Sequence, residues 1–433
     1  MYAEHLWTPQ GWQRDAWVDG ASGVEVRARF ALPGMPNLHS HAFQRAMAGL
    51  AERRGPGDDS FWTWREAMYA FASRIGPEDL QAIAAQLYVE MLKAGYTQVC
   101  EFHYLHNAPD GKPCADPAAM SHAIIEAARE TGIRLTLLPV LYMTGGFDGR
   151  PLSERQRRFG LSVDAYLRLL DALIALEGAS MHVGIALHSL RAVPEAAMRE
   201  VLASKLAGDR VVHIHVAEQI GEVQDCLAVR GTRPVQWLFD HADVDARWCL
   251  VHATHLDAAE VAALAHSGAV AGLCPTTEAN LGDGLFPLAG YLDAGGMLGI
   301  GSDSHISVSP VEELRWLEYG QRLATRHRNV AARTRDASVG DTLWRAAWQG
   351  GCQAAGVAKD AARGDFIVLD DTSPLLAARD ARDVLDTFLF AGNAPLVRDV
   401  MTGGEWVVRD FRHRDEDRIA QRYRAVVDAL AAP

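Results

Sequence analysis

The stretch Pro36-Asn37-Leu38-His39-Ser40-His41-Ala42 closes a short apolar run that begins at Leu32. Side chains alternate along a β-strand, so the two histidines of this His-x-His pattern share one face and their ring nitrogens converge. Two neutral imidazoles on a rigid strand end make half of a zinc site, because zinc in proteins usually takes four ligands. On its own, the pattern is better explained by two unrelated polar residues in a turn. The rest of the chain therefore has to supply the missing ligands.

Short apolar runs rich in β-forming residues alternate with longer helical patterns along most of the 433 residues. The predicted strands are Leu32–Leu38, Thr97–Phe102, Leu135–Leu141, His182–Leu187, Val211–Val216, Cys249–Val251, Ala269–Leu273 and Met297–Ile300. The predicted helices between them include Pro77–Ala94, Pro117–Thr131, Val163–Leu176, Pro194–Leu206, Ala258–His266 and Pro310–Ala324. Eight strands separated by helices predict an α/β fold, a distorted (β/α)₈ TIM barrel, that extends from Leu32 to about Gly356.

The two ends of the chain have a different pattern. Five short strands joined by Gly, Asn and Pro turns are predicted at Val24–Phe30, Asp365–Leu369, Asp386–Phe390, Leu396–Met401 and Glu405–Val408. They predict a small β-sandwich domain built from both termini, followed by a polar amphipathic packing helix at Asp415–Leu430. The expected division is residues 32–360 for the barrel, and residues 1–31 and 361–433 for the small domain and the terminal helix.

Composition narrows the class of protein. Hydrophobic residues make up 49% and charged residues 22%, which is ordinary for a globular protein. The formal net charge is -13 and no basic cluster is flanked by aromatic residues, which argues against nucleic acids and anionic membranes as partners. Residues 1–20 lack a secretory pattern, no apolar run approaches spanning length, and the six cysteines show no Cys-x-x-Cys spacing. We expect a cytoplasmic protein with reduced thiols.

Polar residues follow most of the predicted barrel strands. In a barrel of this type the chemistry collects at the C-terminal ends of the strands. The residues found there are His39 and His41, Glu101 to Tyr104, His188 and Arg191, His215 and Glu218, His252, and Asp303. A single histidine at such a position is more often structural than a ligand, but chance does not readily place polar residues at so many strand ends.

With these residues the chain resembles the amidohydrolase superfamily, in its single-metal deaminase branch. The pattern of that superfamily is His-x-His after the first strand, His after the fifth and sixth strands, and Asp after the eighth. The resemblance implies one Zn²⁺ per chain, with Fe²⁺, Co²⁺ or Mn²⁺ as alternatives, held by His39, His41, His215 and Asp303. Relatives with two metals use a bridging lysine, and none of the four lysines (93, 112, 205, 359) follows a predicted strand.

Glu218 stands three residues after His215, the His-x-x-Glu spacing typical of the deaminase branch. A carboxylate at this place can exchange protons with a substrate nitrogen while a metal activates water. Taken alone, Glu218 could be an acidic residue favoured by a helix dipole, and Asp303 could be a helix cap. We expect Glu218, His252 and Asp303 to be catalytic, the last two acting on the water.

Other histidines are weaker candidates. His213 shares a strand face with His215 but is expected one layer deeper, in the core or behind the ligands. His103, His106, His255 and His305 are each expected to be structural.

The loops after the strands carry cations and hydrogen-bond donors rather than rings for stacking on a base. Arg65 and Arg191 suggest a substrate with carboxylates, since a guanidinium fork matches carboxylate geometry. Taken separately, either arginine could form a surface ion pair. Gln44, Tyr104 and His188 are the other polar residues of these segments.

A narrower resemblance supports this interpretation. The stretches 36–45, 61–65, 101–104, 188–193, 213–219, 251–254 and 301–304 are similar to those of the iminohydrolases of histidine degradation. It implies a homodimer that binds N-formimino-L-glutamate through Gln44, Arg65, Tyr104, His188 and Arg191, and releases ammonia and N-formyl-L-glutamate. The alternatives are a deaminase of a cyclic amine such as guanine, cytosine or a modified adenosine, a binuclear enzyme that opens a cyclic amide, and a non-catalytic scaffold homologue.

Overall fold

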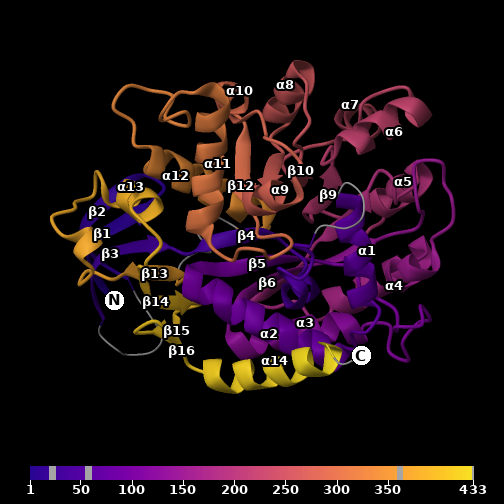
Figure 1. Ribbon diagram of the computed structural model, residues 1–433, viewed down its shortest axis with the longest axis horizontal. Coiled ribbons are helices and arrows are strands. Elements are labelled where there is room, and N and C mark those ends of the chain that lie inside the picture. The colour runs from indigo at the N-terminus through magenta and orange to yellow at the C-terminus, as the bar shows by residue number, and fades with distance from the viewer. Residues whose placement is uncertain (19–25, 54–60, 358–363, 432–433) are drawn as a thin grey trace.

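The computed structural model describes residues 1–18, 26–53, 61–357 and 364–431, which form a parallel barrel and a second, mixed sheet (Figure 1). The barrel strands are bonded in the order β12-β11-β10-β9-β8-β6-β5-β4, and β7 pairs with β6 beside them. Their bounds are β4 Met35–Ser40, β5 Tyr96–His103, β6 Arg134–Leu141, β7 Met181–Val183, β8 Ile185–Ser189, β9 Val212–Val216, β10 Trp248–His252, β11 Val270–Leu273 and β12 Met297–Ile300. The predicted TIM barrel is confirmed.

The first and last barrel strands meet at residues that the sequence singled out. Ser40 and Asp303 form an isolated parallel bridge, in which the amide of His41 donates to the carbonyl of Asp303 (3.2 Å). The amide of Asp303 in turn donates to the carbonyl of His39 (3.0 Å). The barrel is therefore joined by backbone hydrogen bonds at the His-x-His motif.

Two predicted strands are each interrupted at a glycine. The run from Leu32 leaves the mixed sheet at Pro33, the end of β3 (Arg27–Pro33), and enters the barrel at Met35. A Cβ on the intervening Gly34 would lie 2.1 Å from a side-chain atom of Thr97, so the chain can cross there only without a side chain. The run from His182 divides at Gly184 into β7 and β8.

Helices surround the barrel, and the six predicted ones are confirmed to within a few residues. They are α2 Pro77–Ala94, α3 Ala119–Thr131, α4 Val163–Ile174, α5 Glu195–Ala203, α8 Ala258–Ser267 and α11 Pro310–Thr325. The others between β4 and β13 are α1 Phe61–Ala72, α6 Ile220–Arg230, α7 Pro234–His241, α9 Pro275–Leu281, α10 Leu288–Asp293 and α12 Val339–Ala354, with 3₁₀ helices η1 Ala42–Met47 and η2 Glu154–Phe159. Among the residues described, none of the helices is both long and apolar enough to cross a bilayer.

Both termini contribute to the mixed sheet, as expected for the small β-domain (Figure 1). It is one continuous sheet, bonded in the order β16-β15-β14-β13-β3-β1-β2. The remaining bounds are β1 Tyr2–Thr8, β2 Gly11–Trp17, β13 Phe366–Leu369, β14 Val397–Thr402, β15 Glu405–Arg409 and β16 Arg412–His413. The hairpin of β1 and β2 was not predicted from the sequence.

The strand predicted at Asp386–Phe390 is wrong, because this segment is the helix α13, Val384–Phe390. Its buried residues are Val384, Leu385, Phe388 and Leu389, a spacing that places them on one face of a helix. This face packs on α12, where the rings of Phe388 and Trp344 lie 5.6 Å apart. A run of only seven residues rich in β-forming types has too little length for its period to separate strand from helix.

The predicted C-terminal helix is confirmed as α14, Glu416–Ala431, which lies along α2 (Figure 1). Ile419 is buried in the contact, and the Nζ of Lys93 lies 2.7 Å from a carboxylate oxygen of Glu416. Of the expected domain borders, the one after residue 31 falls inside β3, and the one after residue 360 lies outside the described residues. The division into domains stays a prediction.

A glycine on α12 sets how closely this helix approaches the barrel. A Cβ on Gly350 would lie 2.0 Å from the carbonyl oxygen of Leu298 on β12, where only backbone could give way. We expect Gly350→Ala to lower the free energy of unfolding by about 2 kcal/mol or more, through overpacking. Gly290→Ala is the control, because Gly290 is an exposed helical residue with nothing within 4 Å of its added Cβ. Urea unfolding measures both, and equal stabilities of the two variants would contradict the prediction.

Candidate active site

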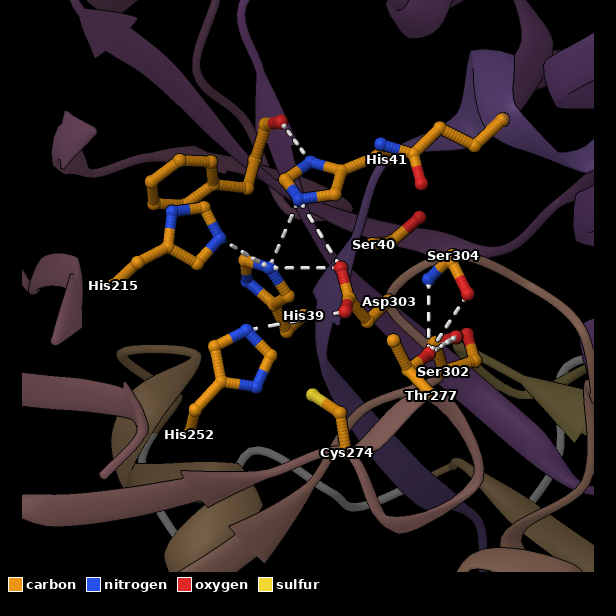
Figure 2. A network of polar contacts seen from close by, with 12 residues as sticks. His39, Ser40, His41, His215, His252, Cys274, Thr277, Ser302, Asp303 and Ser304 are labelled. Atoms are coloured by element: carbon orange, nitrogen blue, oxygen red, sulfur yellow. Dashed lines mark hydrogen bonds and ion pairs between the residues drawn. The ribbon is translucent and has the colours of Figure 1, made fainter. Parts of the chain in front are cut away.

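Four side chains converge at the C-terminal end of the barrel (Figure 2). They are His39 on β4, His41 directly after it, His215 on β9 and Asp303 beyond β12. The Nε2 atom of His39 lies 3.1 Å from that of His41 and 2.9 Å from that of His215. Oδ1 of Asp303 lies 3.4 Å from Nε2 of His39 and 3.2 Å from Nε2 of His41.

The tautomers of two of these histidines follow from their hydrogen bonds. Nδ1 of His41 donates to the carbonyl of Phe102 (2.9 Å), and Nδ1 of His215 donates to the carbonyl of His188 (2.8 Å). A carbonyl can only accept, so each Nδ1 carries the hydrogen and each Nε2 presents a lone pair to the cluster. Lone pairs held this close repel each other unless a cation lies between them.

Burial favours the neutral imidazoles that a metal requires. It lowers the pKa of His39 to about 3 and holds that of His215 well below its usual value. Burial alone would raise the pKa of Asp303, but contacts with His39 and His41 bring it well below the usual range. The donor spacings of 2.9–3.4 Å are close to the edge of about 3.3 Å of a tetrahedron with zinc-like bonds of about 2.0–2.1 Å. The residues present fit a bound divalent metal.

Neighbouring residues hold the ligand loop in place. The buried Glu101 on β5 accepts hydrogen bonds from Oγ of Ser40 (2.5 Å) and from the amide of Ala42 (2.6 Å). Its burial raises its pKa to about 7. His252 and Asp303 have left-handed φ angles of 68° and 43°, which are uncommon for non-glycine residues.

His252, at the end of β10, lies between three carboxylates. Its Nδ1 donates to Oε1 of Glu278 (3.3 Å), while its Nε2 lies 3.8 Å from Glu218 and 3.9 Å from Oδ2 of Asp303. Burial alone would lower the pKa of His252, but Glu218 and the other carboxylates raise it to about 10. Burial also raises the pKa of Glu218, which precedes α6. These two groups are therefore placed to exchange protons.

A cavity opens onto the cluster. The polar and charged residues that line it are His41, Gln44, Arg65, Tyr104, His188, Arg191, His215, Glu218, His252 and Asp303. All five residues expected to bind substrate thus line one cavity with three of the four metal-ligand candidates. The amide Nε2 of Gln44 donates to the hydroxyl of Tyr104 (2.8 Å), which leaves the hydroxyl hydrogen of Tyr104 for another acceptor.

Several residues at the site were missed in the sequence. The cavity is walled by Trp64, Met68, Tyr69, Tyr142, Phe159 and Leu281. Behind the wall, Nε2 of Gln156 donates to the hydroxyls of Tyr142 (2.9 Å) and Tyr69 (3.4 Å). Most of these residues come from helices and loops, so a search of the C-terminal ends of the predicted strands does not find them. Glu278 had a signal, because it is an acidic residue shortly after the predicted strand Ala269–Leu273.

The weaker candidates have other partners. Nε2 of His213 donates to the carbonyl of Ala354 (2.8 Å), one layer below His215, and Nε2 of His106 donates to that of Val140 (2.9 Å). His305 lies between the hydroxyls of Ser40 and Ser302. The residues lining the cavity include neither His103 nor His255. Lys93, Lys112 and Lys205 do not line it either, and Lys359 lies outside the described residues.

The sequence pattern of the amidohydrolase family matches residues 30–407. The chain belongs to the amidohydrolase family. It is 54% identical to formimidoylglutamate deiminase of Pseudomonas aeruginosa, over 99% of both chains. This amidohydrolase also superposes on the crystal structure of an amidohydrolase from Brucella melitensis with a TM-score of 0.94, at 44% identity and over 100% and 99% of the two chains.

A more distant relative shares the fold alone. The crystal structure of an adenosine deaminase from Xanthomonas campestris, which has zinc bound, matches this amidohydrolase with a TM-score of 0.79. The two are 22% identical over 99% and 97% of their lengths. The family therefore places the four-donor cluster in an enzyme, while the substrate has to be argued from the cavity.

Proposed function

We propose that this amidohydrolase is a formimidoylglutamate deiminase, which hydrolyses N-formimino-L-glutamate to N-formyl-L-glutamate and ammonia. The observation that carries the proposal is a single cavity that opens onto the four-donor cluster and is lined by the buried Glu218 and two arginines. The 54% identity to the Pseudomonas aeruginosa enzyme over nearly the full length of both chains supports it. A substrate with an amidine at one end and two carboxylates matches this combination of groups.

The proposed metal is one Zn²⁺ held by His39, His41, His215 and Asp303. When bound, zinc supplies a water that ionises near neutral pH. Asp303 and His252 orient the attacking water, and the ionised carboxylate of Asp303 accepts its proton; Oδ2 of Asp303 and Nε2 of His252 lie 3.9 Å apart. The attack is on the formimino carbon, which is already electrophilic in an amidinium.

Glu218 completes the reaction by proton transfer. Its carboxyl lines the cavity and lies 3.8 Å from His252, so it can hydrogen-bond the terminal nitrogen of the amidine. Burial raises its pKa, which favours the protonated form that can donate to this nitrogen. We propose that Glu218 passes a proton to this nitrogen, which then leaves as ammonia.

Binding of the two carboxylates is assigned to the arginines. Arg65 comes from α1 and Arg191 follows β8, so they approach the cavity from different elements. The hydroxyl hydrogen of Tyr104 and the ring of His188 add hydrogen-bonding groups beside them. A guanidinium binds a carboxylate in a bidentate fork, which fixes the direction of the substrate as well as its charge.

The direct test is ammonia release from N-formimino-L-glutamate by protein of measured metal content. Guanine and cytosine serve as comparison substrates for a deaminase of cyclic amines. We expect release from N-formimino-L-glutamate alone, at about one zinc per chain. If fully metallated protein released no ammonia, the proposed substrate would be wrong, whereas the assignment to the amidohydrolase family would still hold.

Arg191→Ala is expected to lower kcat/KM by about 30- to 1,000-fold, which corresponds to about 2–4 kcal/mol for one partner of a buried charged contact. Most of the loss should appear in KM, because the carboxylate is held equally in ground and transition states. Steady-state kinetics measures both constants. Arg199→Ala is the control, because Arg199 is an exposed arginine on α5 paired with Glu195. An unchanged kcat/KM in Arg191→Ala would exclude the proposed carboxylate contact.

The resemblance to the iminohydrolases of histidine degradation leads us to propose that the reaction belongs to that pathway and that two chains form a homodimer. Sedimentation equilibrium of the metallated protein tests the second point, and a single species of 47.2 kDa would contradict it.

A further inference from the structure

A second group of metal-binding side chains adjoins the first. His252 ends β10, and Cys274 and Asp303 follow the neighbouring strands β11 and β12; one donor atom of each residue lies within 4.8 Å of the other two. All three residues are buried. In Figure 2 the thiol of Cys274 points toward the side of the cluster where His252 and Asp303 lie.

The donor atoms of this group face one another, and two of them must lose a proton to bind a cation. Nδ1 of His252 is bonded to Glu278, so its Nε2 is the nitrogen that faces Asp303. Glu278 also accepts the backbone amide of Cys274 (2.9 Å), which fixes the direction of the cysteine. The Sγ atom of Cys274 has no hydrogen bond to any residue that the structure describes.

Asp303 can serve both groups, because its two oxygens face different neighbours. Oδ1 lies 3.2–3.4 Å from the Nε2 atoms of His41 and His39, whereas Oδ2 lies on the side of His252. A carboxylate in this position can bridge two cations, one on each oxygen.

We propose that His252, Cys274 and Asp303 form a second, inhibitory site for a thiophilic divalent cation, such as Cd²⁺ or excess Zn²⁺. Thiolate, imidazole and carboxylate together suit these ions, whereas Mg²⁺ prefers oxygen ligands alone. Binding forms a metal–sulfur bond and a metal–nitrogen bond, and it releases the thiol proton of Cys274 and the Nε2 proton of His252 to solvent, with no change in oxidation state. The cation occupies Nε2 of His252 and Oδ2 of Asp303, so these groups no longer act on the attacking water.

The inhibition, but not the binding, rests on the proposed function. The binding test therefore needs no substrate. Protein loaded with one zinc per chain is titrated with Cd²⁺ while the ultraviolet charge-transfer band of a cadmium thiolate is recorded, and bound metal is counted by equilibrium dialysis. We expect one cadmium to bind per chain in addition to the zinc, with the band, in the wild type. Cys274→Ala should show neither the band nor the additional cadmium.

Cys114→Ala is the matched control, because Cys114 is the cysteine that is not fully buried and could bind cadmium nonspecifically. This variant should retain both signals, and Mg²⁺ should produce neither. The band in Cys274→Ala, or its loss in Cys114→Ala, would overturn the proposal. If Cys274→Ala does not fold, Cys274→Ser replaces it. An unchanged cadmium affinity in Cys274→Ser would also overturn the proposal.

Activity supplies the second readout. Cd²⁺ at saturation should lower hydrolysis of N-formimino-L-glutamate by about tenfold or more in the wild type, and by less than about twofold in Cys274→Ala. Equal inhibition of both proteins would reject the inhibitory role. A wild type that binds the cadmium but never hydrolyses this substrate would reject the proposed function and leave the binding site standing.

Discussion

Replacing Glu218 with glutamine should leave the metal content unchanged and lower kcat by about 1,000-fold, within the range of about 10²–10⁴ that proton transfer by a positioned side chain contributes. Glutamine keeps the size of the side chain and can still hydrogen-bond the substrate nitrogen, but it cannot accept and return a proton. KM should change much less than kcat, because the carboxylate contacts lie elsewhere in the cavity. Metal analysis and steady-state kinetics on the same preparation measure these quantities.

Glu222→Gln is the matched control for this prediction. Glu222 is a buried carboxylate one helical turn after Glu218, and its Oε2 accepts the backbone amide of Glu218 (3.1 Å) without lining the cavity. A glutamine oxygen can accept the same bond, so kcat should stay within a few-fold of wild type, about 1 kcal/mol at most. A near-normal kcat in Glu218→Gln would exclude proton transfer by this residue.

Removing the metal should abolish turnover and also destabilise the protein. Without a cation, the Nε2 atoms of His39, His41 and His215 face one another at the distances described. A ligand that binds only the folded state stabilises it by about 4 kcal/mol at a thousand times its dissociation constant. We therefore expect chelated protein to unfold at a lower temperature, and one equivalent of zinc to restore both activity and thermal stability.

Two histidines on β9 separate loss of the metal from general damage to the fold. His215→Ala should bind less than one metal per chain and have no measurable turnover. His213→Gln changes a histidine on the same face of the same strand that bonds to the carbonyl of Ala354 instead. It should keep its metal. Full activity of chelated protein, or of His215→Ala, would refute the proposed metal site.

The barrel and its metal-ligand candidates could be predicted because each depends on a short, local sequence pattern. The His-x-His motif, His215 and Asp303 each follow a buried apolar run, and the parallel topology brings these strand ends together. The exact ends of the strands could not be predicted in the same way. At Gly34 the chain passes from the mixed sheet to the barrel within one apolar run. The crossing depends on the close approach of Thr97, which is distant in sequence.

The parts that were missed depend on contacts between distant segments. The sequence predicts a strand in place of α13, because the run is short and its helical conformation depends on packing against α12. Tyr69, Tyr142 and Gln156 meet at the cavity from α1, the segment after β6, and η2. Tyr69 and Gln156 have no local signal that distinguishes them from ordinary packing residues, whereas Tyr142 directly follows the predicted strand Leu135–Leu141.

The seam between β4 and β12 bears on the order in which the molecule can mature. His41 and Asp303 follow the first and last strands of the barrel, yet their main chains are hydrogen-bonded to each other. A chain emerging from the ribosome therefore carries His39 and His41 long before the residue that completes the cluster. The candidate metal site cannot be complete before the eighth strand docks, so we expect partly folded chains to be inactive. We therefore expect activity only in chains whose barrel has closed.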